Sequence, residues 1–255
     1  MSGHSKWSTI KRQKGAADVK KGQAFTKLAN VITIAVKLGG SGNPDDNPRL
    51  QMAIETSRGV NMPKDNIQSA IDRGLGKGGA LALEEVLYEG FGPGKVAFMV
   101  EGVSDNKMRT TAGIKNTFER SGGSMVGQGS VAYMFDRIGE IRVKLQESRV
   151  KSQDEEMLEL IDLGAEDVED SSAEEERGYL VYVQSPKLNT MSTKIIQAGY
   201  EVESSEIVYK PNTLVQITDK ETAQKVLDFT EKLEDNEDVH KVYANFDIPE
   251  NLINE

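Results

Sequence analysis

Lysine and arginine side chains crowd the first 27 residues of this chain, and their chemistry is that of phosphate contact. Only one carboxylate, Asp18, stands among the seven cations, which are Lys6, Lys11, Arg12, Lys14, Lys20, Lys21 and Lys27. Such groups neutralise nucleic-acid phosphates without reading the base sequence. Trp7 is the only tryptophan of the chain and offers a flat ring on which a base can stack. The pattern favours nucleic-acid binding by these seven cations and Trp7.

A structural interpretation of the same segment is also open, in which the cations form a solvated surface and Trp7 anchors a core. The distribution of charge bears on the choice. Residues 1–80 contain 13 Lys and Arg against 6 Asp and Glu, a net charge of +7. Residues 81–255 contain 18 against 35, a net charge of −17. A polyanion would be attracted to one end of the molecule and repelled by the rest, so we expect a local contact surface.

Catalytic and metal-binding patterns do not stand out in the sequence. The chain has no cysteine, which excludes disulfides, thiolate metal sites and a cysteine nucleophile. Its two histidines, His4 and His240, lie far apart in the sequence. The acidic runs 154–156 and 174–176 are typical of solvated faces and of first helical turns. We therefore expect no enzyme activity, no cofactor, no metal and no small-molecule substrate.

The stretch Gly90 to Lys95 has the glycines of a phosphate-binding loop. Such a loop needs Ser or Thr after the lysine and a helix whose N-terminus faces the phosphate. Here Val96 follows the lysine and opens an apolar run typical of a strand. The Gly-Pro-Gly sequence at 92–94 instead predicts a turn between two strands.

Helical periodicity dominates residues 1–80. The basic segment continues into an amphipathic helix that should end at Gly39-Gly40; its apolar positions are Phe25, Leu28, Ile32, Ala35 and Val36. Asn47 suits a helix N-cap, with Pro48 at the first helical position. A further helix is predicted from Pro63 to Gly74. The glycine-rich string 74–79 then predicts a junction, with a domain boundary at Ala80.

The pattern changes to strands from Leu83 onward. Residues 137–210 show the order strand-helix-strand-strand-helix-strand of a ferredoxin-like unit. The segments before and after residues 137–210 are typical of two halves of a second such unit. The first half is strand 95–102, helix 106–121 and strand 130–135. The second half is strand 213–218, a helix around 223–233 and strand 240–246. The predicted fold is α+β and multidomain. Its three domains are a helical basic domain at 1–80, a discontinuous α+β domain at 81–136 and 211–255, and an α+β domain inserted at 137–210.

Several strings then resemble the YebC/PmpR family, in order along nearly the whole chain. They are Gly3-His4-Ser5-Lys6-Trp7, Phe25-Thr26-Lys27-Leu28, Asn47-Pro48-Arg49-Leu50, Asn61-Met62-Pro63-Lys64-Asp65, Tyr88-Glu89-Gly90-Phe91-Gly92-Pro93-Gly94 and Gly129-Ser130-Val131-Ala132-Tyr133. The resemblance implies three domains and a non-enzymatic regulator of gene expression. It begins at Gly3, which leaves no room for a transit peptide and favours a bacterial, cytoplasmic member.

Two functions remain open under this resemblance. Bacterial members are described as DNA-binding transcriptional regulators, whereas the mitochondrial relative activates translation and some members act on ribosomes stalled at proline-rich stretches. The first function needs an element that reads base edges, and the second needs phosphate contacts and shape fit. The arm is rich in lysine and poor in arginine, which suits point-charge contact with phosphates. The partner is thus expected to be DNA or ribosomal RNA. No apolar run reaches the roughly 20 residues of a membrane span, and a monomer is expected.

Overall fold

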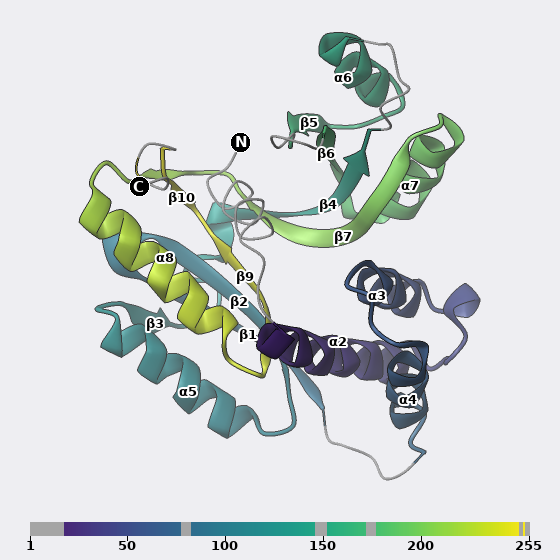
Figure 1. Cartoon of the computed structure of the whole chain (residues 1–255). Helices are drawn as coiled ribbons and strands as arrows, with labels where there is room; N and C mark the ends of the chain where they lie inside the picture. The colour runs from purple at the N-terminus through teal and green to yellow at the C-terminus, as the bar shows by residue number, and fades with distance from the viewer. Residues whose placement is uncertain (1–17, 78–82, 146–151, 172–176, 250–251, 253–255) are drawn as a thin grey trace. The chain divides into compact units, whose positions relative to one another are not determined.

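The computed structural model describes residues 18–77, 83–145, 152–171, 177–249 and 252 (Figure 1). These residues belong to two compact units. One spans Asp136–Lys210, and the other combines the described residues up to Phe135 with those from Pro211 onward. Both helices and antiparallel sheets are present, which confirms the predicted α+β fold. The division of the whole chain into three domains stays a prediction.

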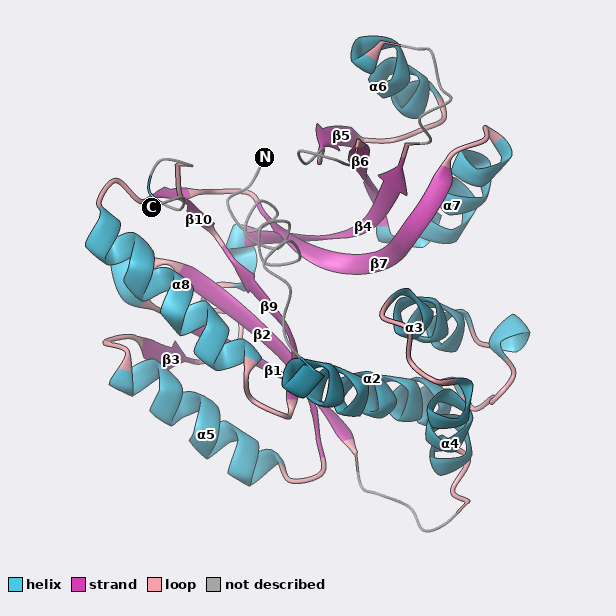
Figure 2. Cartoon of the chain, in the orientation of Figure 1, coloured by secondary structure: helices cyan, strands magenta, loops and turns pink. Residues whose placement is uncertain are grey.

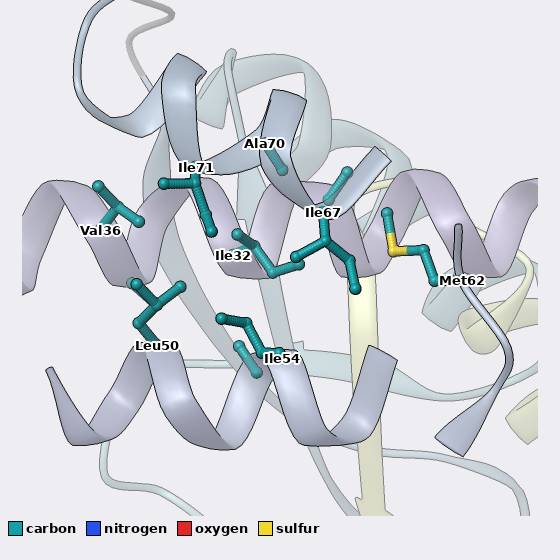
Figure 3. Packing of buried hydrophobic residues seen from close by; sticks show 11 residues of the cluster. Ile32, Val36, Leu50, Ile54, Met62, Ile67, Ala70 and Ile71 are labelled. Carbon is teal, nitrogen blue, oxygen red and sulfur yellow. The ribbon is translucent and has the colours of Figure 1, made fainter. Parts of the chain in front are cut away.

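Three α-helices open the larger unit: α2 (Asp18–Gly39), α3 (Pro48–Gly59) and α4 (Lys64–Gly74), with a short 3-10 helix η1 (Pro44–Asp46) before α3. Their apolar stripes meet in one core (Figure 3), whose labelled members are Ile32, Val36, Leu50, Ile54, Met62, Ile67, Ala70 and Ile71. Each stripe repeats at three- and four-residue spacing, so each helix buries one face against the other two. The predicted helix end at Gly39-Gly40 is confirmed, and Gly40 has φ +69°.

Asn47 connects α2 to α3 through three hydrogen bonds. Its Oδ1 accepts from the Leu50 N–H at 3.1 Å, which confirms the predicted N-cap. Its Nδ2 donates to the carbonyls of Ala35 and Ser41, both at 3.0 Å. The residue is 2% exposed. A buried amide of this kind stabilises the structure only while its partners are present.

Asn47→Ala is expected to lower the free energy of unfolding by roughly 2–4 kcal/mol, because it removes a cap and leaves a buried carbonyl without its donor. Thermal unfolding followed by circular dichroism measures the loss. Asn66→Ala is the matched control, since Asn66 is exposed on α4 and should change stability by no more than about 0.5 kcal/mol. Equal melting temperatures for the two variants would contradict the assignment.

The larger unit also contains a four-stranded sheet in the order β3-β1-β2-β9. Its strands are β1 (Glu84–Phe91), β2 (Ala97–Ser104), β3 (Ser124–Val126) and β9 (Val239–Ala244). Two helices, α5 (Lys107–Arg120) and α8 (Lys220–Glu234), lie along the sheet (Figure 2). Phe98 from β2, Phe118 from α5 and Phe229 from α8 meet edge to face, with centroid separations of 4.9 Å for Phe98–Phe229 and 5.0 Å for Phe118–Phe229. This aromatic cluster joins both helices to the sheet.

The glycine-rich stretch at 90–95 is a hairpin connection, as predicted. Strands β1 and β2 pair antiparallel from Glu84–Ser104 to Phe91–Ala97. The short 3-10 helix η2 (Pro93–Lys95) joins them, and the Gly92 N–H donates to the Val96 carbonyl at 2.8 Å. Gly94 has φ +67°, a left-handed conformation that glycine adopts without strain. The segment thus connects two strands and precedes no helix N-terminus that could hold a phosphate.

Two predicted strands of this unit are wrong. Residues 130–134 form turns and the 3-10 helix η3 (Ala132–Met134), because the N–H groups of Val131 and Ala132 bond to the Glu89 carboxylate and not to a strand. Phe135 already belongs to the next strand. Within 213–218 only β8 (Val215–Gln216) is extended, and it pairs with β10 (Phe246–Asp247) in a separate two-stranded sheet. Strand β1, and not residues 213–218, completes the four-stranded sheet of this unit. The sheet therefore differs from the ferredoxin-like sheet predicted for the flanks.

The unit Asp136–Lys210 has the predicted ferredoxin-like order. Its elements are β4 (Phe135–Lys144), α6 (Gln153–Asp162), β5 (Asp167–Asp170), β6 (Gly178–Gln184), the 3-10 helix η4 (Ser185–Lys187), α7 (Leu188–Gln197) and β7 (Glu201–Pro211). The sheet runs β5-β6-β4-β7, with β6 antiparallel to both of its neighbours. Strand β6 is buried over nearly its whole length, as a central strand covered by α6 and α7 should be.

Candidate nucleic-acid interface

Five of the eight residues predicted to bind nucleic acid lie outside the described residues: Lys6, Trp7, Lys11, Arg12 and Lys14. Lys20 and Lys21 lie in the first turn of α2, where the backbone is described and the side chains are not. The structure therefore places the side chain of Lys27 alone. The binding role of the whole set stays a prediction.

Lys27 contacts the protein itself. Its Nζ donates to the backbone carbonyl of Glu234, the last residue of α8. A helix C-terminus carries unpaired carbonyls and partial negative charge, so an ammonium group is favourable there. Lys27 thus joins α2 to α8, a role that its place in the basic run did not reveal.

Two further cations of the helical region hold it to the sheet of the same unit. The Lys37 Nζ donates to the Leu83 carbonyl at 3.0 Å, and Arg49 forms an ion pair with Glu85 of β1. Beside these polar contacts, Ile34 of α2 packs in a small buried cluster with Leu83 and Val103. These contacts explain why α2, α3 and α4 belong to one compact unit with the sheet.

Arg58, Lys64 and Arg73 differ from those cations. Within the part of the chain that the structure describes, their side chains make no ion pair or hydrogen bond. Arg58 lies in the last turn of α3, Lys64 begins α4 and Arg73 lies in the last turn of α4. All three lie on the α3–turn–α4 segment, so they could add phosphate contacts to those of the N-terminal arm.

The α3–turn–α4 segment has the spacing of a helix-turn-helix, with four residues between the helices. However, Ile67, Ala70 and Ile71 face inward on α4. The outward face is therefore centred on Asp65, Ser69 and Asp72. Asp65 on that face would repel the phosphates that line a DNA groove, and Asp72 is already paired with Lys77 at 3.0 Å. The sequence identified no recognition helix, and the described geometry of α4 does not supply one.

Positive charge is concentrated at the very start of the chain. Residues 1–21 contain 6 Lys and Arg against 1 Asp, a net charge of +5. Residues 22–77 contain 7 against 5, a net charge of +2. Most of the positive field of the N-terminal region thus comes from the segment that leads into α2 and from its first turn.

A polar cavity of about 700 Å³ lies where α2 meets the turns β2–α5 and α8–β9. Asp238 is its central group: its Oδ2 accepts from Thr110 Oγ1 at 2.5 Å and from Arg109 Nη2 at 3.1 Å. Hydrogen bonds from the Arg109 guanidinium to Asp238 and then to Asp105 raise the pKa of Arg109. Each of these side chains is paired, so the network has a structural role in holding the two turns together.

The described residues contain no group of three or more His, Cys, Asp or Glu side chains placed to hold a metal ion. Among them, no helix is both long and apolar enough to pass through a bilayer.

The comparisons with known proteins agree with the resemblance found in the sequence. Residues 5–77 match the family model of the TACO1/YebC protein N-terminal domain, and residues 83–246 match that of the TACO1/YebC second and third domain. Proteins named probable transcriptional regulatory protein are similar over nearly their whole length. The one from Chloroflexus aurantiacus is 46% identical over 99% of this chain and 98% of its own. The one from Geobacter sulfurreducens is 43% identical over 97% and 96%.

A solved structure is also similar to this one. It is a conserved hypothetical protein from Aquifex aeolicus, 40% identical, with a TM-score of 0.81 over 91% of this chain and 93% of that one. Sequence and structure thus place the chain in the class of α+β proteins that these two family models describe. The chain belongs to the TACO1/YebC family.

Proposed function

We propose that this protein is a non-enzymatic regulator of gene expression that binds nucleic acid through its basic N-terminal segment. The observation that carries the proposal is the concentration of a net +5 charge in residues 1–21, against −17 in residues 81–255. Lys6, Lys11, Arg12, Lys14, Lys20 and Lys21 contact phosphates, and Trp7 stacks on a base. Lys27, which contacts α8, positions the helix that carries this segment.

The direct target is structured RNA, recognised by phosphate contact and shape. Three observations support this choice over a DNA sequence reader: the arm has one arginine among its cations, α4 presents Asp65 and Asp72 outward, and most of the chain is acidic. A duplex lying across the whole molecule would be repelled. The binding footprint is therefore small and confined to the N-terminal region.

Transcriptional regulation by direct DNA binding is the second candidate. The name that the Chloroflexus and Geobacter relatives carry, probable transcriptional regulatory protein, favours it. This function requires discrimination between base sequences, and specific DNA binders prefer their sites by at least about a thousandfold over other DNA. The two candidates therefore differ in a quantity that can be measured.

At about 150 mM salt, where exposed charges are screened beyond about 8 Å, the protein is expected to bind a promoter fragment and a scrambled fragment of equal length with similar affinity. At the same salt it should cosediment with large ribosomal subunits in a sucrose gradient. Filter binding and sedimentation of the full-length chain measure the two outcomes. A preference of about a thousandfold for the promoter fragment would favour the DNA reader instead.

A further inference from the structure

The described residues include a single exposed aromatic side chain, that of Tyr133, which is 69% exposed. Tyr133 lies on the 3-10 helix η3 after strand β3, and its hydroxyl makes no hydrogen bond within the described part of the chain. Burial of an aromatic ring is normally favourable because the ring carries a large apolar area. An exposed ring is therefore a candidate contact for a partner, and the surrounding loop bears on which partner it fits.

Two sets of hydrogen bonds fix the loop of residues 127–134 that carries Tyr133. On one side, the buried Glu89 carboxylate accepts from three backbone N–H groups of residues 129–132, at 2.6, 2.8 and 3.0 Å. On the other side, the Asn212 amide donates to the Tyr133 carbonyl at 3.0 Å, and the Asn212 N–H donates to the next carbonyl at 2.9 Å. Burying a carboxylate is costly unless it is hydrogen-bonded. Here it holds a surface loop, and a ring on a preorganised backbone loses less entropy when it binds.

The same loop lies in the longest uncharged run of the sequence, residues 121–135, although 28% of the chain is charged. Burial does not explain this run, since residues 127–130 are all exposed. The segment 211–218, which contains Asn212, is also uncharged, and its Leu214 is 38% exposed. Residues 127–134 and 212–214 form what we call the Tyr133 patch. Within residues 81–255, whose net charge is −17, this patch has no exposed carboxylate of its own to repel a polyanion.

An unpaired base is the ligand that suits the Tyr133 patch. The patch has no cation, so it cannot hold a duplex through its phosphates. A base that is splayed out of an RNA helix, in a loop, a bulge or an end, stacks on an exposed aromatic ring. Such stacking accepts any base, because every base has a π-face. A proline-rich peptide also packs on aromatic rings, but it usually needs a groove lined by several of them.

We propose that Tyr133 stacks on an unpaired base of the RNA whose phosphates the basic N-terminal segment contacts. This inference rests on the proposed function, which supplies the polymer, and it adds that the target contains an unpaired nucleotide. The two contacts differ in their response to salt. Phosphate contacts release counterions and weaken as salt rises, whereas stacking on a neutral ring releases none. Loss of the ring should therefore lower the affinity by the same factor at every salt concentration.

The first test is filter binding of the full-length protein to two RNAs with the same number of phosphates, a hairpin with an unpaired loop and a fully paired duplex. Tyr133→Ala should weaken hairpin binding about tenfold, a loss typical of one base–aromatic stack. It should leave duplex binding and the salt slope unchanged. Tyr133→Phe should bind like the wild type, because it keeps the ring. Met108→Ala is the matched control, since Met108 is 85% exposed on α5 and should change neither affinity.

The second test uses adenosine, which offers a base without a phosphate and so does not depend on the basic segment. Millimolar adenosine should shift the amide resonances of residues 128–134 in the wild type and in Tyr133→Phe, but not in Tyr133→Ala. Met108→Ala should respond like the wild type.

Equal hairpin affinities of the wild type and Tyr133→Ala would overturn the proposal, as would loop amides that adenosine fails to shift. A proline-rich peptide that shifts these amides where adenosine does not would assign the patch to a peptide instead. Failure of the proposed function has a different signature, in which the protein binds neither RNA while adenosine still shifts the loop amides.

Discussion

Changing Lys11, Arg12, Lys14, Lys20 and Lys21 together to Glu is expected to abolish RNA binding, with an affinity loss of at least about a thousandfold at low salt. The five side chains supply most of the positive field of residues 1–21, and reversing them makes that segment acidic like the rest of the chain. Lys20 and Lys21 lie in the first turn of α2, and the other three precede the described residues. Other residues form the buried cores of the two compact units, so both units should stay folded. Filter binding measures the affinity, and circular dichroism checks the fold.

The salt dependence of the wild-type protein provides a second measure of the same contacts. If five phosphates are engaged, log K should fall against log salt with a slope of about −4.5 on a duplex DNA probe and about −3.5 on a single strand. A control variant with the same change in net charge reverses five exposed cations elsewhere: Lys107, Lys115, Arg120, Lys187 and Lys232. It should lose far less affinity, because long-range repulsion is screened by salt. Equal losses in the two variants would show that net charge alone governs binding.

Glu89→Ala is expected to release the loop after β3 and to lower the free energy of unfolding by roughly 3–5 kcal/mol. Glu89 is 2% exposed, and its carboxylate accepts from three backbone N–H groups: Gly129 at 2.6 Å, Val131 at 2.8 Å and Ala132 at 3.0 Å. Hydrogen bonds to an ionised group in low-dielectric surroundings are the strong ones, and their donors would be left without partners.

Hydrogen exchange gives the local readout for this substitution. The amides of Gly129, Val131 and Ala132 should exchange much faster in the variant, while amides of β6 in the other unit keep their protection. Glu84→Ala is the matched control, since Glu84 lies on the same strand but is exposed. It should change stability by no more than about 0.5 kcal/mol. Unchanged exchange at the three amides would mean that the loop is held by other contacts.

Features set by neighbouring residues could be predicted from the sequence. Side chains within a few positions of one another set the apolar period of α2, its end at Gly39-Gly40 and the N-cap at Asn47. The hairpin turn at 92–94 depends on the backbone preferences of Gly and Pro. The order of elements in the unit Asp136–Lys210 was also predictable, because most of its elements have a local pattern: alternation in β4, an apolar run in β6 and helical spacing in α7.

The sequence predicted how many cations the candidate interface contains, but not which of them are free to face a partner. Cations repeat along the first 27 residues, and that is visible without a structure. Which of them face a partner depends on contacts from distant elements. Lys27 bonds to a carbonyl 207 residues away, a contact that no local pattern signals. Likewise, the outward position of Asp65 and Asp72 on α4 follows from which face the other helices bury.

Tertiary structure alone decided the sheet of the larger unit. Strand β9 pairs with β2, and Asn245, which directly follows β9, accepts from the Ala97 N–H of β2 at 2.7 Å, 148 residues away in the sequence. Such pairings depend on loop closure over more than a hundred residues and on buried hydrogen bonds that only a folded chain can complete. The exposure of Leu158 and Ile161 on α6 has the same origin. The sequence of α6 shows aliphatic residues at helical spacing, but only the burial of Glu156 and Leu160, with Glu156 bonded to Tyr179 of β6, leaves Leu158 and Ile161 in solvent.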